Sequence, residues 1–157
     1  MNRYLKPVLY MLAALVSFSA CDPRKITDEY RTLDHSKWDA DSAQTFRFSI
    51  YRKDQYHNLF FNIRNDRSYP FSNLWLFVTI ESPKGETRTD TVQVILADPA
   101  GKWLGKGFSG IYNNRPLYMQ NVSFPDPGNY TVRILHGMRP SQLKGITDIG
   151  IRVEKVN

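Results

Sequence analysis

Residues 74–80 read Leu-Trp-Leu-Phe-Val-Thr-Ile, a run that is apolar on both faces of an extended chain. Turn-forming residues bound the run, with Tyr69-Pro70 before it and Ser82-Pro83-Lys84-Gly85 after it. Aromatic and β-branched residues between turns are typical of a strand, and apolar residues on both faces are typical of a strand inside a sheet. The sequence therefore predicts a central strand here, with Trp75 and Phe77 in the core.

The segments around this run alternate apolar and polar residues, as half-buried strands do. Phe46, Phe48 and Ile50 alternate with polar neighbours, and residues 59–63 repeat the pattern. Further β-like segments, each bounded by turn-forming residues, are residues 89–96, 117–124, 129–135 and 146–156. No segment after residue 40 keeps a helical period over three turns. Roughly seven or eight short strands predict an all-β fold, an antiparallel β-sandwich of immunoglobulin-like or jelly-roll-like type.

The segment Asp126-Pro-Gly-Asn-Tyr130 resembles the tyrosine corner of immunoglobulin-like sandwiches. In that corner the tyrosine hydroxyl forms a hydrogen bond to the chain a few residues upstream. We expect Tyr130 to have this structural role rather than a role in a binding site.

The composition suits one packed domain. The chain has 157 residues, of which 41% are hydrophobic and 23% are charged. Lysine and arginine number 21 against 15 acidic residues, and the basic residues are scattered among the acids, so we interpret the net charge of +6 as a solvated surface. The single cysteine, Cys21, excludes an intramolecular disulfide and a thiolate metal cluster.

The N-terminus has the parts of a secretory signal, with a basic start, a short apolar stretch and small residues at Ser19-Ala20. The apolar stretch is well short of the roughly 20 residues that cross a bilayer as a helix. Cys21 follows directly and resembles the cysteine of a bacterial lipobox, whose sulfur receives a diacylglyceryl group; the alternative is an ordinary signal with an accidental cysteine. Acyl chains on Cys21 would hold the domain on a membrane outside the cytoplasm, where nucleic acid and nicotinamide cofactors are not expected partners.

The segment after the cysteine is polar, with Ile26, Tyr30, Leu33 and Trp38 to anchor it. We interpret it as a tether followed by a partly docked arm. The expected division of the chain is a lipoprotein signal peptide over residues 1–20, the lipidated tether and arm over 21–43, and the β-sandwich over 44–157.

One glycine-rich loop has the spacing of a dinucleotide-binding motif. It reads Gly105-Lys-Gly-Phe-Ser-Gly110, but residues 111–116 after it will not begin the helix that such a motif needs. We expect these glycines instead to let the loop approach a neighbouring backbone closely.

Other catalytic and metal-binding patterns are weak. The histidines His35, His57 and His136 lack the spacing that places two imidazoles on one metal ion. Neither Ser109 nor Ser141 has the sequence context of a catalytic nucleophile. A pair of carboxylates from distant strands, as in glycoside hydrolases, stays open as an alternative. The sequence predicts no catalytic residue, no metal site and no cofactor.

The aromatic residues say more about function than these catalytic and metal-binding patterns do. Tyr51 and Tyr56 flank a predicted hairpin turn on its outer side. Four aromatic residues in and after the glycine-rich loop form the candidate surface for a ligand or partner: Trp103, Phe108, Tyr112 and Tyr118. Exposed aromatic rings can stack on sugars or form the centre of a protein interface, although loops that fold back would bury them instead.

Two short patterns, Asp41-Ser42-Ala43 and Asp90-Thr91-Val92, are similar to the acceptor that some gliding bacteria use for O-glycosylation. Ser42 and Thr91 are therefore candidate modification sites, and Ser42, in the polar arm, is the better of the two.

Several segments together resemble the gliding-motility lipoprotein family GldH. They are the lipobox at Cys21, the arm Tyr30-Arg-Thr-Leu to Trp38, the strand Phe46-Arg-Phe-Ser-Ile, the segment Tyr69-Pro-Phe-Ser-Asn-Leu-Trp, the loop Trp103-Leu-Gly-Lys-Gly and the closing Gly145-Ile-Thr-Asp-Ile-Gly-Ile-Arg-Val. The resemblance implies a lipoprotein of the outer membrane, linked functionally to type IX secretion, with envelope proteins of the gliding and secretion machinery as partners. It implies no enzymatic activity and no known ligand. Relatives in species that do not glide leave the process itself open.

The sequence therefore favours a lipid-anchored, non-catalytic scaffold of an envelope machine. The alternative is a surface glycan-binding module that uses Trp103, Tyr112 and Tyr118, and a third reading is a hydrolase with two carboxylates in a deep cleft.

Overall fold

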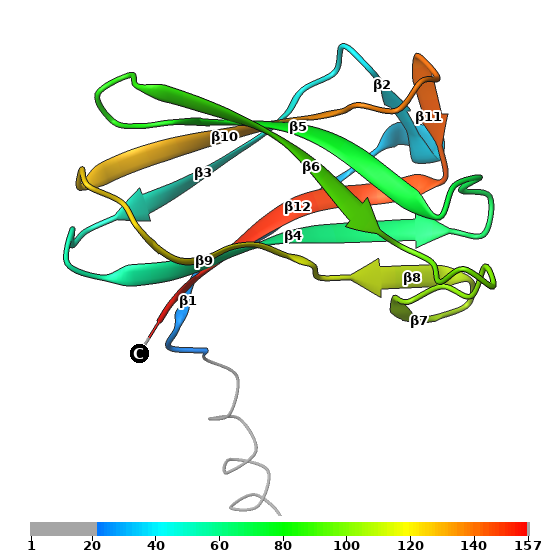
Figure 1. Cartoon of the computed structure of the whole chain (residues 1–157), viewed down its shortest axis with the longest axis horizontal. Helices are drawn as coiled ribbons and strands as arrows, with labels where there is room; N and C mark the ends of the chain where they lie inside the picture. The colour runs from blue at the N-terminus through cyan, green and yellow to red at the C-terminus, as the bar shows by residue number, and fades with distance from the viewer. Residues whose placement is uncertain (1–21, 157) are drawn as a thin grey trace, which may run out of the picture.

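The computed structural model describes residues 22–156, which fold into two facing antiparallel β-sheets (Figure 1). The predicted leader and Cys21 lie outside the described residues. The first sheet has the strand order β1 (Lys25–Thr32), β12 (Ile146–Lys155), β4 (Tyr56–Asp66), β8 (Ile111–Asn114) and β7 (Lys106–Phe108), and β9 (Leu117–Ser123) also pairs with β4. The second sheet has the order β3 (Gln44–Ile50), β10 (Gly128–His136), β5 (Asn73–Glu81) and β6 (Thr87–Ile95).

A small ribbon closes one end of the sandwich. It pairs β2 (Lys37–Asp39) with β11 (Gln142–Lys144), and the short 3-10 helix η1 (Asp34–Ser36) leads into it. The all-β antiparallel sandwich predicted from the sequence is confirmed. Residues 22–156 contain twelve strands rather than seven or eight, because strands that are short or have few apolar residues show no alternation of apolar and polar residues in the sequence.

The core lies between the two sheets, where alternate side chains of each strand point inward. On β5 the inward residues are Leu74, Leu76, Val78 and Ile80, all buried. They face inward residues of the first sheet such as Ile63, which is fully buried on β4. This alternation fixes the register of both sheets, because a slip of one residue would turn the buried set toward water.

The expectation that Trp75 and Phe77 lie in the core is wrong. The strand is central in its sheet, paired with β10 and β6 on either side, as predicted. However, the side chains of Trp75 and Phe77 lie on the outer face and are 37% and 44% exposed. A two-layer sandwich buries one face of each sheet, so an apolar residue between two inward residues points outward even on an inner strand.

The two local motifs expected to be structural are confirmed. The Tyr130 hydroxyl donates a hydrogen bond to the backbone carbonyl of Asp126 at 2.9 Å, as in a tyrosine corner. In the glycine-rich loop, a Cβ on Gly107 would stand 1.7 Å from the carbonyl oxygen of Ile111 across the β7–β8 turn. Only a glycine allows the two backbones to approach so closely.

The polar arm is part of the sandwich from Lys25 onward. Residues 25–32 form β1, an edge strand that pairs with β12 from Lys25 opposite Glu154 to Thr32 opposite Asp148. Trp38 on β2 is 1% exposed, and its indole N–H donates to the carbonyl of Ser42 at 2.8 Å. The arm predicted as partly docked is therefore a paired strand and a buried anchor.

Candidate functional site

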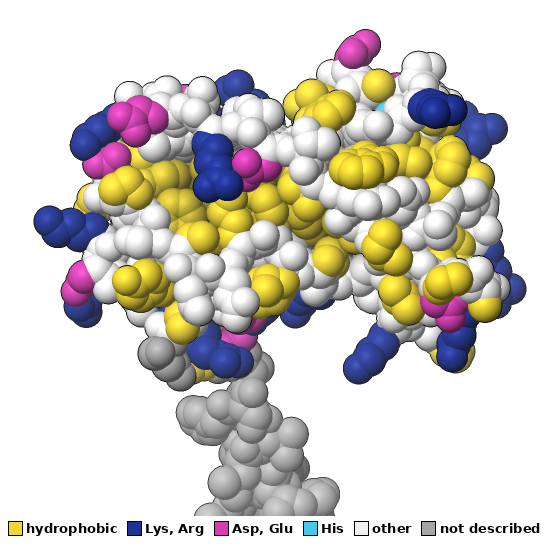
Figure 2. All heavy atoms as spheres, viewed as in Figure 1, with side chains coloured by type: hydrophobic (Ala, Val, Ile, Leu, Met, Phe, Trp, Pro, Cys, Tyr) yellow, Lys and Arg dark blue, Asp and Glu magenta, His cyan; other side chains and the backbone are white. Residues whose placement is uncertain are grey.

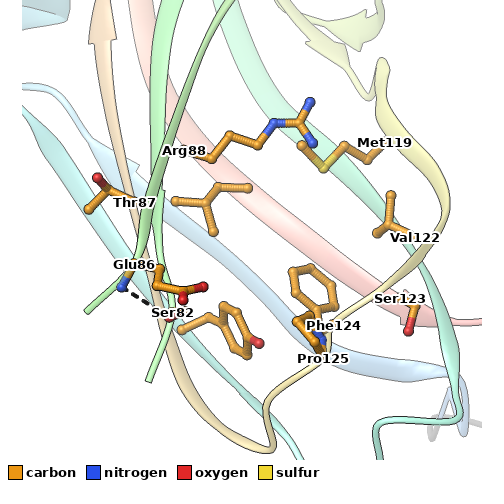
Figure 3. A pocket seen from close by; sticks show the side chains of 11 residues that line it. Ser82, Glu86, Thr87, Arg88, Met119, Val122, Ser123, Phe124 and Pro125 are labelled. Carbon is orange, nitrogen blue, oxygen red and sulfur yellow. Dashed lines mark hydrogen bonds between the residues drawn. The ribbon is translucent and has the colours of Figure 1, made fainter. Parts of the chain in front are cut away.

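A cavity of about 420 Å³ opens between the two sheets on the side of β6 and β9. Figure 3 shows its lining side chains, which come from both sheets and from the turn after β9. Its apolar lining consists of Ile80, Met119, Val122, Phe124, Pro125 and Tyr130. Figure 2 shows hydrophobic side chains gathered in a band across the middle of this face. The sandwich is therefore open along one side, with apolar surface in reach of a partner.

Charged residues on β6 help to keep this side open. Arg88 and Asp90 lie on the inward parity of the strand, where a closed sandwich would need apolar residues. They pair with each other at 3.1 Å from the guanidinium Nε to the carboxylate Oδ1. Closing the sandwich here would bury these charges between the two sheets, which is costly, so they disfavour closure.

A hydrogen bond joins the two sheets between β6 and β9, the strands that flank the cavity. The hydroxyl of Tyr118 on β9 donates to Oδ2 of Asp90 on β6 at 2.6 Å, and the Tyr118 ring stacks on Phe61 with ring centroids 4.7 Å apart. Burial first, and then the neighbouring Asp90 carboxylate, raise the pKa of Tyr118 well above its ordinary value, so the hydroxyl remains a donor.

The edge of β6 that faces the cavity pairs with no strand of the described residues. This strand ends its sheet and forms its ladder with β5 alone. An edge strand presents a row of backbone N–H and C=O groups that an added strand can pair with. Because an apolar cavity lies beside this edge, the site can accept an extended segment through backbone hydrogen bonds and apolar side chains together.

The four aromatic residues predicted as one surface lie in three places. Trp103 is half-buried and packs between Tyr112, at 5.6 Å between ring centroids, and Tyr69, at 6.3 Å. Phe108 is 90% exposed on the β7–β8 hairpin, whereas Tyr118 is half-buried on β9 and bonded to Asp90 of β6. The structure brings Trp103 and Tyr112 together but separates Phe108 and Tyr118 from them.

The exposed aromatic rings that sequence reasoning missed are on the second sheet. Trp75 and Phe71 line a shallow hollow with Met138, and the backbone N–H of Trp75 donates to the Met138 sulfur at 3.3 Å. Phe77 packs over Gly137, where a Cβ would stand 3.0 Å from its ring. The signal was present in the sequence, since Trp75 and Phe77 alternate with Leu74, Leu76 and Val78. Because every residue of this run but Thr79 is apolar, the alternation between inward and outward side chains was hidden.

The candidate modification sites are accessible. Ser42 lies in the turn before β3, and Thr91 lies on the outer face of β6; both are exposed. Modification of either residue stays a prediction.

The histidines have structural surroundings. His57 and His136 are buried, and burial lowers the pKa of each below its ordinary value. Nε2 of His136 lies 3.0 Å from the carbonyl oxygen of Trp38. Across residues 22–156, no group of three or more His, Cys, Asp or Glu side chains is placed to hold a metal ion. The same part of the chain contains no helix of the length and hydropathy needed to cross a bilayer.

Fold and leader together define a class of protein, a lipoprotein whose folded part is an antiparallel β-sandwich. The sequence pattern of the GldH lipoprotein family matches residues 25–153. The gliding motility lipoprotein GldH of Flavobacterium johnsoniae is 38% identical over 154 residues, which cover 94% of each chain. The gliding motility lipoprotein GldH homolog of Christiangramia forsetii is 35% identical over 155 residues, again 94% of each chain.

The chain therefore belongs to the GldH lipoprotein family, and the resemblance predicted from its sequence is confirmed. It is a lipid-anchored protein of the cell envelope, and the family is one of lipoproteins rather than a known family of enzymes. Among solved structures, one from infectious bursal disease virus, Gx strain, is 14% identical at a TM-score of 0.35, covering 87% of this chain and 33% of that one. That likeness is too weak to support an inference.

Proposed function

We propose that this protein is a non-catalytic assembly component of the gliding-motility machinery, linked to type IX secretion and anchored in the outer membrane by acyl chains on Cys21. The observation that carries the scaffold role is the open side of the sandwich, where the unpaired edge of β6 lies beside an apolar cavity. The names of the two relatives support the process, and the position of Cys21 after Ser19-Ala20 supports the lipid.

The occupant that fits the open side is an extended segment of another envelope protein with apolar residues at alternate positions. Backbone hydrogen bonds to β6 would provide affinity, and the cavity would select apolar side chains at every second position. Arg88, whose side chain is 69% exposed at the cavity, adds a cation that favours an acidic residue in the bound segment.

Complementation of a deletion strain tests this proposal. Met119→Arg places a charge in the half-buried apolar lining, whereas Gln93→Arg places the same charge on the exposed outer face of β6. We expect the first variant to fail to restore gliding and type IX secretion and the second to restore both. Thermal unfolding and the amount of each variant in the envelope control for folding. Full function of a stable Met119→Arg protein would exclude the open side as the partner site.

The lipid on Cys21 is tested separately. Labelled palmitate should enter the wild type but not Cys21→Ser, and mass spectrometry of the mature N-terminus should find an acylated cysteine. Equal labelling of the two proteins would exclude Cys21 as the attachment residue.

Glycan binding is the second candidate function, and one observation favours it. The hollow beside Trp75 combines an exposed ring with the side chains of Asn73 and Arg139, a set of groups that suits a sugar ring. A glycan array should then bind the wild type and not Trp75→Ala, with Trp103→Ala testing the loop surface predicted from the sequence. An array on which the wild type binds nothing removes this candidate.

A further inference from the structure

The chain is fixed to the sandwich at Asp22, the residue directly after the proposed lipid attachment. Its carboxylate accepts hydrogen bonds from the backbone N–H of Arg24, at 3.1 Å, and from the guanidinium of Arg152 on β12. Its carbonyl oxygen accepts from the N–H of Lys25 at 3.2 Å. Asp22 is therefore held at both its backbone and its side chain.

The partner of Asp22 is itself immobilised. Arg152 is 7% exposed, and its guanidinium also donates to Asp28 at 2.6 Å and to Glu154. Asn62 on β4 donates to the same Asp28 carboxylate at 2.7 Å. A guanidinium with so little exposed surface is stable only with carboxylate partners, so the cluster favours the docked position of Asp22.

Because Asp22 is docked, no flexible linker lies between the sandwich and the proposed lipid attachment. Consecutive Cα atoms are about 3.8 Å apart, so Cys21 can stand no further than that from a residue held against the sheet. The tether expected from the sequence would begin directly after Cys21, but Asp22 is hydrogen-bonded to Arg24 and Arg152, and the chain is paired in β1 from Lys25. The anchor and the sandwich must therefore move as one body.

We propose that one end of the sandwich lies against the headgroups of the membrane in a fixed orientation, and that this end binds anionic lipid. The proposal rests on the lipidation of Cys21 proposed above. The membrane-facing end consists of residues 22–25, the β3–β4 turn at residues 51–56, and residues 155–156 at the end of β12.

Backbone hydrogen bonds and a shared hollow join these three segments into one surface. The N–H of Lys155 donates to the carbonyl of Arg24 at 2.8 Å, and the N–H of Val156 donates to the carbonyl of Tyr56 at 2.8 Å. Gln55 lines a shallow hollow with Arg24 and Lys155. Figure 1 shows the start of β1 beside the end of β12 at this end of the sandwich.

The side chains of this end suit an anionic headgroup layer. Tyr51 is 82% exposed and Tyr56 is 56% exposed, and tyrosine is enriched where one end of a side chain is apolar and the other is wet. The exposed residues Lys53 and Lys155 have no acidic partner within 4 Å in the described part of the chain. Basic residues close to a membrane are attracted by anionic lipids.

A matched pair of fluorescent labels tests the orientation. Acylated full-length mature protein carries its only natural cysteine as a thioether, so a cysteine introduced by Gln55→Cys or Gln142→Cys is its one free thiol. Gln55 lies on the membrane-facing end, and Gln142 lies on β11 in the ribbon at the far end. In vesicles that contain phosphatidylglycerol and a headgroup-attached quencher, we expect quenching of the Gln55 label and little quenching of the Gln142 label. Equal quenching of the two would overturn the proposal.

Salt and lipid charge test the second half of the proposal. Quenching of the Gln55 label should be stronger in anionic than in neutral vesicles, and the difference should disappear at 1 M salt, where the Debye length is about 3 Å. No difference between the two lipids at low salt would overturn the anionic-lipid assignment.

Vesicle sedimentation and mass spectrometry distinguish failure of the lipid anchor from failure of the orientation. An unacylated protein that does not sediment refutes the anchor and this inference together, whereas an acylated, sedimenting protein with equal quenching refutes this inference alone.

Discussion

Arg152→Met is the sharpest test of how the N-terminal strand is held. Arg152 joins carboxylates from three parts of the chain, namely Asp22, Asp28 and Glu154. Methionine keeps an unbranched apolar stem of similar width but removes the guanidinium. Asp28 and Glu154 would then lose their common cation, and the edge strand β1 would keep the hydrogen bond from Thr32 to Asp148 but lose the ion pair that ties Asp28 to β12.

The expected loss follows from the burial of the cluster. The Arg152 side chain is 9% exposed, and those of Asp28 and Glu154 are 19% and 17% exposed. Removing one partner of a buried ion pair costs about 3–5 kcal/mol of unfolding free energy. Residual hydration, and Arg115 at 3.5 Å from Asp28, place the expected loss at the lower end, about 3 kcal/mol.

Urea and thermal unfolding of the mature protein measure this loss. A loss of that size should lower Tm by about 10 °C in a domain of this length. Arg133→Met is the matched control, because Arg133 and Glu81 form an ion pair at 3.4 Å whose side chains are 57% and 38% exposed. Its removal should cost less than about 1 kcal/mol.

The pH dependence separates lost charge from lost packing. Burial raises the pKa of Asp28, but hydrogen bonds from Arg152 and Asn62 outweigh it, so the pKa lies below 3.8. A carboxyl with a lowered folded-state pKa stabilises the fold above pH 3.8, and that contribution is lost as the pH falls through the lowered value. The stability gap between wild type and Arg152→Met should therefore narrow in acid. A gap that stays constant in acid, or one no larger than that of Arg133→Met, would refute this account of the cluster.

Three further predictions concern single side chains. Burial lowers the pKa of His136 below 6.5, so the fold favours the neutral imidazole, and the free energy of unfolding of the wild type should fall as the pH falls below 6.5. In urea titrations between about pH 7 and 5, the free energy of unfolding of His136→Gln should therefore fall less than that of the wild type. Tyr118→Phe keeps its stacked ring but loses the 2.6 Å hydrogen bond to Asp90, and calorimetry should find a loss of about 1–2 kcal/mol. Gly150→Ala would place a Cβ 1.9 Å from the carbonyl oxygen of Glu29, so limited proteolysis should cut within β1 of this variant sooner than within β1 of wild type.

The strands that the sequence predicted are those whose side chains alternate between core and water. Residues 46–50, 59–63 and 74–80 all lie within strands, because burial of one face imposes a period of two. The edge strand β1, with the sequence Lys-Ile-Thr-Asp-Glu-Tyr-Arg-Thr, has no such pattern. Its position depends on pairing with β12 and on the Arg152 cluster, and neither leaves a local signal.

The aromatic surfaces and the contact between Asp90 and Tyr118 were not predicted from the sequence, for a related reason. The aromatic residues were chosen by type and by closeness in the chain, yet Phe108 and Tyr112 separate while Trp103 meets Tyr69. Asp90 and Tyr118 meet between the two sheets although they are 28 positions apart in the sequence. A sandwich is built from contacts between strands distant in sequence, so its surfaces are also assembled from distant residues.

The contact between Asp22 and Arg152 extends this reasoning to function. The two residues are 130 positions apart, and their contact requires β12, nearly the last segment of the chain, to be in place. The docked N-terminus therefore forms only when the sandwich is complete. In a protein anchored at Cys21, an incomplete fold would leave residues 22–32 as a flexible tether between the membrane and the domain. A complete fold would instead hold the open side at a fixed angle to the membrane. Partner binding at β6 should then depend on Arg152, which does not line the cavity, in membranes but not in detergent solution.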